Sequence, residues 1–264
     1  MTSHTASLAQ HLYIITGASK GMGLEMARQL LSPQHQVLCI SRTASSELAQ
    51  AASVAAAPLT QWCENLAEPE SVAQRLRAWL AQRDSAAVHS ATLINNAGTL
   101  GAMAPLQTVS PAIVTQAITV DLLAPLHLTA AFLQATGDWP SRQKVLNISS
   151  GMSQRAMAGA ALYGAAKAGM DQFSRCVALD EARRPNGARI VSLAPGVIDT
   201  DMQQELRNGD DTLFPDKARY IQLQATGALL SPREAARQVL AYLHHAEFGQ
   251  ESVVNIVQKR DLLQ

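Results

Sequence analysis

Thr16-Gly17-Ala18-Ser19-Lys20-Gly21-Met22-Gly23 is the stretch that decides the fold of this 264-residue chain. It follows an apolar run at 11–16 and opens a helical segment at 21–31, so it forms a turn between a strand and a helix. Glycines permit a tight turn and a close backbone approach, and a helix N-terminus attracts a pyrophosphate. Glycine-rich turns also occur for structural reasons alone, but a dinucleotide site requires this strand–turn–helix context. We therefore expect six residues of the turn to contact a dinucleotide: Gly17, Ser19, Lys20, Gly21, Met22 and Gly23.

Apolar, strand-like runs alternate with helical segments along the rest of the chain. The strands are expected at 11–16, 36–41, 59–63, 91–95, 144–149, 188–194 and 252–257. The helices are expected at 21–31, in the Ala-rich segment after residue 41, and at 71–83, 111–136, 162–183 and 231–244. Ser110 is expected to cap the helix at 111–136, and Ser231-Pro232 to open the last helix. This alternation predicts an α/β fold of the Rossmann type in a single domain, with a doubly wound, seven-stranded parallel sheet flanked by helices.

Two parts of the chain fall outside the alternation. Residues 1–10 are interpreted as an N-terminal leader, and residues 11–264 as one dinucleotide-binding catalytic domain. The connection at 195–230 contains Gly209, Pro215, Gly227 and several charges, and it is much longer than the other connections. We interpret about 196–230 as a mobile lid over the substrate rather than as a second domain.

The composition of the chain limits its function classes. Hydrophobic residues make up 47% and charged residues 16%, which predicts a large core. Lys+Arg and Asp+Glu both number 21, so no basic excess indicates a nucleic-acid or membrane surface. The leader does not have the pattern of a targeting signal, and the apolar stretch at 122–133 is too short to cross a bilayer. We expect a soluble, cytoplasmic protein with no nucleic-acid partner and no membrane partner.

The three cysteines, Cys39, Cys63 and Cys176, match no zinc or redox spacing. We therefore expect no metal site. Cys39 and Cys63 fall in strand-like runs, which favours buried free thiols.

The residues after the second strand indicate which nucleotide binds. Sites that prefer NAD usually carry an acidic residue there for the ribose 2′-hydroxyl, whereas this chain has Ser41 and Arg42. The guanidinium of Arg42 can bind a 2′-phosphate in a fork geometry, and Lys20 adds a second cation nearby. Both could be ordinary surface charges, but their two positions together favour NADP(H).

Tyr163 and Lys167 form a Tyr-x-x-x-Lys pair, and Ser150 stands thirteen residues before the tyrosine. On a helix, residues i and i+4 share a face, so the ammonium can lie beside the phenol and lower its pKa from about 10. Such a tyrosine can exchange a proton with a carbonyl oxygen that Ser150 holds in place. The alternative is that Lys167 is a surface lysine and Tyr163 a residue at the edge of the core. The catalytic interpretation of the pair therefore depends on the other motifs.

Five motifs occur in one order: the glycine-rich turn, Asn95-Asn96-Ala97-Gly98, Ser150, the Tyr163/Lys167 pair and Pro195-Gly196. In this order they resemble the short-chain dehydrogenase/reductase family, and the resemblance covers residues 11 to about 257. It implies that Asn95 braces the sheet, and that the long helices before and after the fifth strand form a homodimer or homotetramer interface. It also implies further cofactor contacts: Asn65, Leu66, Asn96, Ala97, Gly98, Tyr163, Lys167, Pro195, Gly196, Val197 and Thr200.

Asp121 departs from the family pattern, which usually has an asparagine here, thought to hold a water in the proton relay behind the lysine. The backbone carbonyl of Asp121 could keep that role. Its carboxylate, if ionised near Lys167, would partly neutralise the effect of the cation on Tyr163. The resemblance therefore adds Asp121 to Ser150, Tyr163 and Lys167 as a candidate catalytic residue.

A narrower likeness lies in the C-terminal third. Residues 193–204 and 253–256 are similar to the sepiapterin reductase and benzil reductase branch. Asn255 stands where sepiapterin reductase has the aspartate that anchors the pterin, and an asparagine carries no charge. Two substrate classes therefore stay open: a pterin, and an aromatic or vicinal diketone. Asn255 is alternatively a polar residue at a strand end, and Met202 is alternatively a helix-packing residue. The expected substrate contacts are Ser150, Tyr163, Met202 and Asn255.

These residues together predict NADPH-dependent reduction of a ketone or diketone to the alcohol. A hydride would come from the nicotinamide, and Tyr163 would donate the proton. The first alternative is a non-catalytic, NADP(H)-sensing regulatory protein of the same fold, which would have no need of Ser150, Tyr163 and Lys167 together. The second is an NAD-dependent alcohol dehydrogenase, which Arg42 disfavours.

Overall fold

The computed structural model describes the backbone of residues 10–263 and the side chains up to residue 259. Over these residues, seven parallel strands form one sheet in the order β3-β2-β1-β4-β5-β6-β7. The strands are β1 Gln10–Thr16, β2 His35–Ser41, β3 Leu59–Cys63, β4 Val88–Asn95, β5 Arg142–Ile148, β6 Arg189–Ala194 and β7 Val253–Asn255. The predicted doubly wound parallel sheet is confirmed. Residues 1–9 of the predicted leader lie outside the described residues, and its last residue, Gln10, already belongs to β1.

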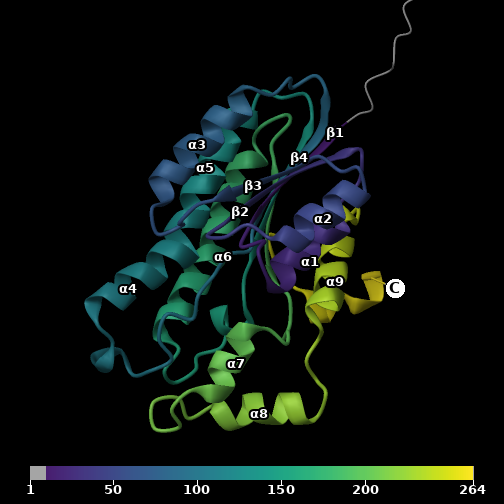
Figure 1. Ribbon diagram of the computed structural model, residues 1–264. Coiled ribbons are helices and arrows are strands. Elements are labelled where there is room, and N and C mark those ends of the chain that lie inside the picture. Colours follow the sequence, from purple (N-terminus) through teal and green to yellow (C-terminus); the bar gives the residue numbers. More distant parts are fainter. Residues whose placement is uncertain (1–9, 264) are drawn as a thin grey trace, which may run out of the picture.

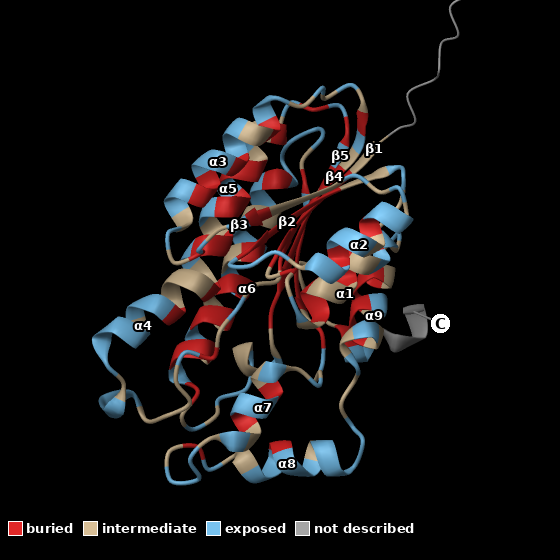
Figure 2. Cartoon of the chain, viewed as in Figure 1, coloured by how far each residue is buried: buried red, intermediate tan, exposed pale blue. Residues whose placement is uncertain are grey.

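Helices cover both faces of the sheet (Figure 1). The α-helices are α1 Gly21–Gln29, α2 Ser46–Val54, α3 Pro69–Ala81, α4 Pro111–Ile118, α5 Ala124–Thr136, α6 Ala161–Glu181, α7 Asp201–Asn208, α8 Lys217–Ala225 and α9 Pro232–His244. One core cluster joins α1 and α9 to the sheet, and a second joins α3 and α5 to the opposite face. Because both faces of the strands are covered, their sequences are continuous apolar runs rather than alternating ones. Figure 2 shows this arrangement as buried residues along the strands and on the helix faces beside them.

Serine caps fix the starts of three helices. The hydroxyl of Ser110 accepts the backbone N–H of Ile113 at the start of α4, as the sequence predicts. Ser45 and Ser231 do the same for α2 and α9. In α4 and α9 a proline follows the cap, where its missing N–H costs no helical hydrogen bond.

The segment 111–136 is not one regular helix. A π-helical turn, η2 at Thr119–Leu123, separates α4 from α5 and carries Asp121. The combined run Pro111–Thr136 is the one helix in the described part of the chain that is long and apolar enough, by length and composition, to cross a membrane. It is therefore longer than the stretch at 122–133 that the sequence indicated. Leu128 and Phe132 are fully buried against the sheet, which accounts for its apolar composition.

The segment from Pro195 to Leu230 is not an irregular loop, because it contains α7 and α8. These two helices lie beyond the carboxyl ends of the strands, outside the two layers that cover the sheet (Figure 1). The two ends of the segment meet: the N–H of Leu230 donates to Val197 at 2.9 Å, and the N–H of Asp199 donates to Leu230 at 2.9 Å. The predicted extended strand at 252–257 is also shorter, since β7 ends at Asn255 and a 3₁₀ turn, η4 Ile256–Leu263, follows.

The cysteines differ from prediction at one position. Cys39 in β2 is a buried free thiol, as expected. Cys63 is exposed, because it is the last residue of β3, and β3 is the edge strand of the sheet. Cys176 on α6 is also exposed.

Candidate active site

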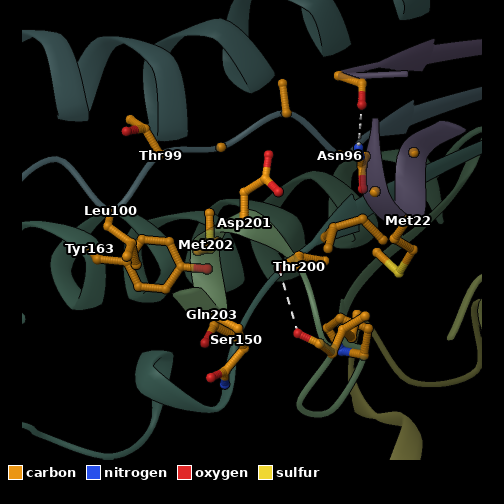
Figure 3. Close-up of a pocket in the computed structure, with 18 of the residues that line it drawn as sticks. Met22, Asn96, Thr99, Leu100, Ser150, Tyr163, Thr200, Asp201, Met202 and Gln203 are labelled. Atoms are coloured by element: carbon orange, nitrogen blue, oxygen red, sulfur yellow. Dashed lines mark hydrogen bonds between the residues drawn. The ribbon is translucent and has the colours of Figure 1, made fainter. Parts of the chain in front are cut away.

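A cavity of about 800 Å³ opens at the carboxyl ends of the strands. In an open parallel sheet this edge is where ligands bind. All of the sequence-predicted site residues except Asp121 line it: Gly17, Ser19, Lys20, Gly21, Met22, Gly23, Ser41, Arg42, Asn65, Leu66, Asn96, Ala97, Gly98, Ser150, Tyr163, Lys167, Pro195, Gly196, Val197, Thr200, Met202 and Asn255. In Figure 3, Tyr163, Leu100 and Met202 lie together on one side of the cavity, and Met22 and Asn96 lie on the other.

Two glycines in the turn after β1 are required by close packing. Gly17 has a φ of 67°, and a Cβ there would lie 2.8 Å from the Cα of Ala97. A Cβ on Gly23 would lie 2.2 Å from the carbonyl oxygen of Gly17. No side chain fits either position, so the backbone at the start of α1 stays exposed to a ligand. Lys20, the N-cap of α1, makes no side-chain cap, which leaves the first N–H groups of that helix available to an anion.

The turn is held in shape by residues from two other strands. The side-chain amide of Asn96 donates to the carbonyls of Thr16 and Gly17 at 3.0 and 3.2 Å. The hydroxyl of Ser41 accepts the N–H of Ala18 at 2.8 Å. Asn96 and Ser41, both predicted as cofactor contacts, therefore also position the turn itself.

The charges beside the turn differ in their pairing. Lys20 forms an ion pair with Asp201 at the start of α7, with Nζ and Oδ2 2.5 Å apart and both side chains mostly exposed. Arg42 lines the cavity and is exposed, and it makes no ion pair with a described residue. Arg42 is thus the unpaired cation at the edge of the cavity next to β2.

A buried polar network supports the centre of the sheet. The side-chain amide of Asn95 donates to Asn147 at 2.8 Å and to Thr129 at 3.2 Å, which links β4 to β5 and α5. Asn147 donates in turn to Ser174 on α6 at 2.9 Å. The structure therefore shows Asn95 bracing the sheet, as the resemblance implies, and the same network fixes the position of α6.

Ser150, Tyr163 and Lys167 converge on one end of the cavity. Ser150 follows β5 and caps the 3₁₀ turn η3 Gly151–Ser153, where its hydroxyl accepts the N–H of Met152 at 3.2 Å. Tyr163 and Lys167 lie one turn apart on α6, and the ammonium is 5.5 Å from the centre of the phenol ring. Lys167 is buried, and its Nζ donates to the carbonyl of Ile148 at 3.0 Å.

The pKa of Tyr163 is raised above its ordinary value, whereas the sequence predicts a lowered one. Burial is the main cause, and the negative charge of Asp121 adds to it. The hydroxyl of Ser150 acts in the opposite direction, toward a lower pKa. Burial also lowers the pKa of Lys167, against the raising effects of Asp121 and Asp171. Tyr163 is therefore protonated at neutral pH, which is the state that a proton donor requires.

Asp121 lies behind Lys167 rather than in the cavity wall. It is 1% exposed, and its Oδ1 accepts the N–H of Thr99 at 2.7 Å. Its other carboxylate oxygen, Oδ2, is buried without a hydrogen-bond partner among the described residues. Burial raises the pKa of Asp121 to about 6, although Lys167 and the Thr99 N–H both act to lower it. The charge of Asp121 raises the pKa of Tyr163, in the direction that the sequence indicates.

Asp171 is a neighbour of Lys167 that the sequence did not bring to attention. It is buried on α6, and its Oδ1 accepts hydroxyl hydrogens from Ser149 at 2.7 Å and Ser192 at 2.6 Å. Its spacing of four residues from Lys167 places both on one face of α6, and that spacing is the signal that could have identified it.

The remaining cofactor predictions fall on the cavity wall. The stretch from Pro195 to Thr200 leaves β6 and ends as the N-cap of α7, with Gly196 at a φ of 89°. Asn65 is exposed, and its side-chain oxygen accepts the N–H of Ala67. Leu66 beside it is buried. These positions follow β6 and β3, on opposite halves of the sheet.

An apolar wall lies beside Tyr163, and most of it was not predicted. Its members come from the segment after β4, from the turn before α6, and from α7 and α8: Leu100, Met152, Met157, Met202, Leu206, Tyr220 and Leu223. Met202 was predicted as a substrate contact, and it does line the cavity. Leu206 on α7 was expected to line the pocket or to pack within a helix, and it lines the cavity too, whereas Tyr220 and Leu223 on α8 were missed.

Asn255 lines the cavity at the end of β7, but its side-chain oxygen accepts the N–H of Val257 at 3.1 Å. This contact is the one expected of a polar residue at a strand end. Asn255 therefore fits both interpretations in part. It lines the cavity, as a substrate contact would, and its side-chain oxygen already accepts a hydrogen bond, as that of a strand-end residue would.

Within the described residues, no group of three or more histidine, cysteine, aspartate or glutamate side chains could hold a metal ion. The cavity offers a serine hydroxyl, a protonated phenol and a buried ammonium beside the glycine-rich turn. Together they can bind a dinucleotide and donate a proton to an oxygen atom.

Comparisons with known proteins agree with this geometry. The family model described as "short chain dehydrogenase" matches residues 11–211. A benzil reductase ((S)-benzoin forming) of Bacillus cereus is 34% identical over 243 residues, which are 92% of this chain and 98% of the relative. A sepiapterin reductase of Bos taurus is 30% identical over 253 residues, which are 91% of this chain and 92% of the relative.

Solved structures share the fold. The provisionally named NAD(P)-dependent gluconate 5-dehydrogenase of Beutenbergia cavernae, crystallised with bound NADP, has a TM-score of 0.78 and 26% identity, covering 94% of this chain and 96% of that chain. Together with the match to the family model and the ordered motifs in one cavity, these similarities show that the chain belongs to the short-chain dehydrogenase/reductase family.

Proposed function

We propose that this oxidoreductase reduces a ketone or vicinal diketone to the alcohol with NADPH. The observation that carries the proposal is the convergence of Ser150, Tyr163 and Lys167 on a cavity that also contains the phosphate-binding turn. The two relatives described above support the substrate class, because benzil is a vicinal diketone and sepiapterin also carries a ketone. Tyr163 is protonated at neutral pH, as a proton donor to the carbonyl oxygen must be, and its raised pKa is consistent with that state.

The cavity suits a dinucleotide with a 2′-phosphate. The pyrophosphate would lie on the turn at Gly17 and Gly23, where a Cβ would collide with neighbouring backbone. The 2′-phosphate would lie at Arg42, which has no ion-pair partner among the described residues, and NADP is bound in the solved relative. Lys167 would hold the nicotinamide ribose, and Gly196 and Val197 would flank the nicotinamide. NADPH bound in this place supplies the hydride.

The residues of the chain would handle the oxygen of the substrate. The hydroxyl of Ser150 donates a hydrogen bond to the carbonyl oxygen and holds it against Tyr163. The phenol of Tyr163 then gives its proton to that oxygen as negative charge develops, so the product leaves as a neutral alcohol. The ammonium of Lys167 stabilises the phenolate that remains, because it is a buried cation 5.5 Å from the ring centre.

The segment at about 196–230 would act as the lid. Helices α7 and α8 contribute Met202, Leu206, Tyr220 and Leu223 to the apolar wall, so closure of the segment would exclude water from the carbonyl. We further propose a cytoplasmic homodimer or homotetramer that pairs through α5 and α6. Leu179 on α6 is 71% exposed and Leu123, the last residue of η2 before α5, is 40% exposed, so both offer apolar surface to such a contact.

The test replaces Tyr163 by phenylalanine, which removes the proton donor and keeps the ring. We expect NADPH consumption with diketones to fall by at least about 100-fold, the usual contribution of a general acid. NADPH binding, followed by fluorescence, should persist. Tyr242→Phe is the matched control, because Tyr242 is a buried tyrosine of α9 away from the cavity. A Tyr163→Phe enzyme that keeps most of its kcat would refute the proposed role.

A further inference from the structure

The half of the cavity beside Tyr163 combines the apolar wall with positive charge. Three of the seven wall residues are methionines, which adapt to irregular shapes and make favourable contacts with aromatic rings. Tyr220 adds an aromatic surface, and its hydroxyl lies 3.5 Å from the sulfur of Met157. A substrate body that fills this wall is therefore apolar, and an aryl group fits its chemistry best.

Two arginines also line the cavity, on segments that contribute to the apolar wall. Arg155 stands between η3 and α6, and Arg219 stands on α8, and both are exposed and line the cavity. Neither makes an ion pair with a described residue. Three acids that line the cavity are paired, by contrast: Asp201 with Lys20, Asp199 with Arg207, and Glu64 with Arg75. Two unpaired arginines in the wall of one cavity are charge available to a ligand.

The electrostatic environment of Tyr220 places one of these charges at the apolar wall. Burial raises the pKa of Tyr220 to about 12, and the positive charge of Arg155 is the first influence that opposes it. Asp216 acts on the same hydroxyl in the other direction, but it does not line the cavity. Glu205 on α7 does line it and is unpaired among the described residues. Among the charged residues of α7, α8 and the turn before α6 that line the cavity and make no ion pair with a described residue, two are cations and one is an anion.

We infer that the physiological substrate is an amphipathic, anionic ketone. Its apolar body lies against the methionines and Tyr220, and a carboxylate at its far end is bound by Arg155 and Arg219. A planar guanidinium binds a carboxylate with two parallel hydrogen bonds, and it does so more strongly when an apolar surface displaces water beside it. This inference rests on the proposed function and adds the substrate class to it.

The test compares two aryl diketones that differ in one group. The first carries a para-carboxylate on its phenyl ring, and the second carries the methyl ester at the same place. Initial rates of NADPH consumption give kcat/KM for each. We expect the carboxylate to be preferred by about 10-fold or more, the usual strength of a hydrogen bond to a charged group. The preference should lie mainly in KM and should shrink in high salt, because the binding is electrostatic and made before the chemical step.

Substitution of the two arginines assigns the preference to them. Arg155→Gln and Arg219→Gln should each lower kcat/KM for the carboxylate several-fold and leave the ester unchanged. Glu205→Gln should raise the carboxylate preference, because it removes the opposing charge. Arg175→Gln is the matched control, since Arg175 is an exposed arginine of α6 outside the cavity. Because Arg155 and Arg219 are exposed and make no side-chain hydrogen bond or ion pair with a described residue, these variants should keep the fold.

The outcomes distinguish the anionic substrate class from the proposed ketone reduction. An ester reduced as well as the carboxylate, or a carboxylate preference that survives both arginine substitutions, overturns the anionic substrate and leaves ketone reduction standing. A protein that consumes no NADPH with either diketone overturns the proposed function itself.

Discussion

Replacement of Asp121 by asparagine removes a charge that the fold holds in an unfavourable place. The carboxyl is 1% exposed, one of its oxygens has no partner among the described residues, and burial raises its pKa from 3.8 to about 6. A group whose pKa is raised by folding stabilises the native state least at high pH. The stability it contributes is fully present below pH 3.8 and is lost as the pH rises through about 6.

The magnitude follows from the same two values. At pH 8 the full shift, from 3.8 to about 6, corresponds to about 3 kcal/mol of lost stability. At pH 5 the same two pKa values give about 1.6 kcal/mol. Asp121→Asn abolishes this titration, so its stability relative to the wild type should increase by about 1.4 kcal/mol between pH 5 and pH 8. The difference between the two pH values cancels any constant effect of the new amide.

Urea denaturation of both proteins at pH 5 and pH 8 measures this difference. Asp138→Asn is the control, because it makes the same chemical change at an exposed acid. The rate of ketone reduction provides a second readout: an inflection near pH 6 in the wild-type profile should be absent from Asp121→Asn. A stability difference that does not change between pH 5 and pH 8 would show that Asp121 does not titrate in this range.

Two further predictions concern the coenzyme and the assembly. Arg42→Glu should raise KM for NADPH by at least about 10-fold and leave KM for NADH almost unchanged, since it replaces a charge-assisted contact to the 2′-phosphate by repulsion. Arg77→Glu, on the exposed face of α3, is the control, and equal KM values for the two coenzymes in the wild type would contradict the assignment. Leu179→Asp should dissociate the proposed oligomer, because Leu179 is 71% exposed on α6, and sedimentation velocity measures the change. Val54→Asp, on an 86% exposed residue of α2, should leave the assembly intact, and a wild-type protein that sediments as a monomer would refute the interface.

The sheet could be predicted from the sequence because its strands are buried on both faces. In a chain that alternates strands and helices, a short continuous apolar run such as 36–41 is typical of a strand covered on both sides, and the third strand begins and ends where the sequence places it. Ser110 and Ser231 marked two helix starts because capping is a local property that does not depend on tertiary contacts. The positions of the motif residues could then be predicted as well, since most of them stand where a strand ends.

The rest depends on contacts that local patterns do not encode. The apolar period of 111–136 continues through the π-helical turn, so nothing in the spacing indicates the interruption at Asp121. Helices α7 and α8 have only eight and nine residues, and their apolar side chains face the cavity and one another rather than the sheet. Tyr220 was missed for that reason. The pKa of Tyr163 could not be derived either, because burial is the main cause of its rise and burial is a property of the whole fold.

The short bridge between Ile198 and Leu230 has an evolutionary consequence. Residues 199–229 leave the rest of the domain and rejoin it at two adjacent points. Their number and sequence can therefore change without moving the strands and helices of the sheet. Transplanting the corresponding segment from a relative should transfer selectivity between carbonyl compounds while the coenzyme preference stays with the recipient. Substrate selectivity in related enzymes can therefore change by replacement of this one segment, while the rest of the fold is kept.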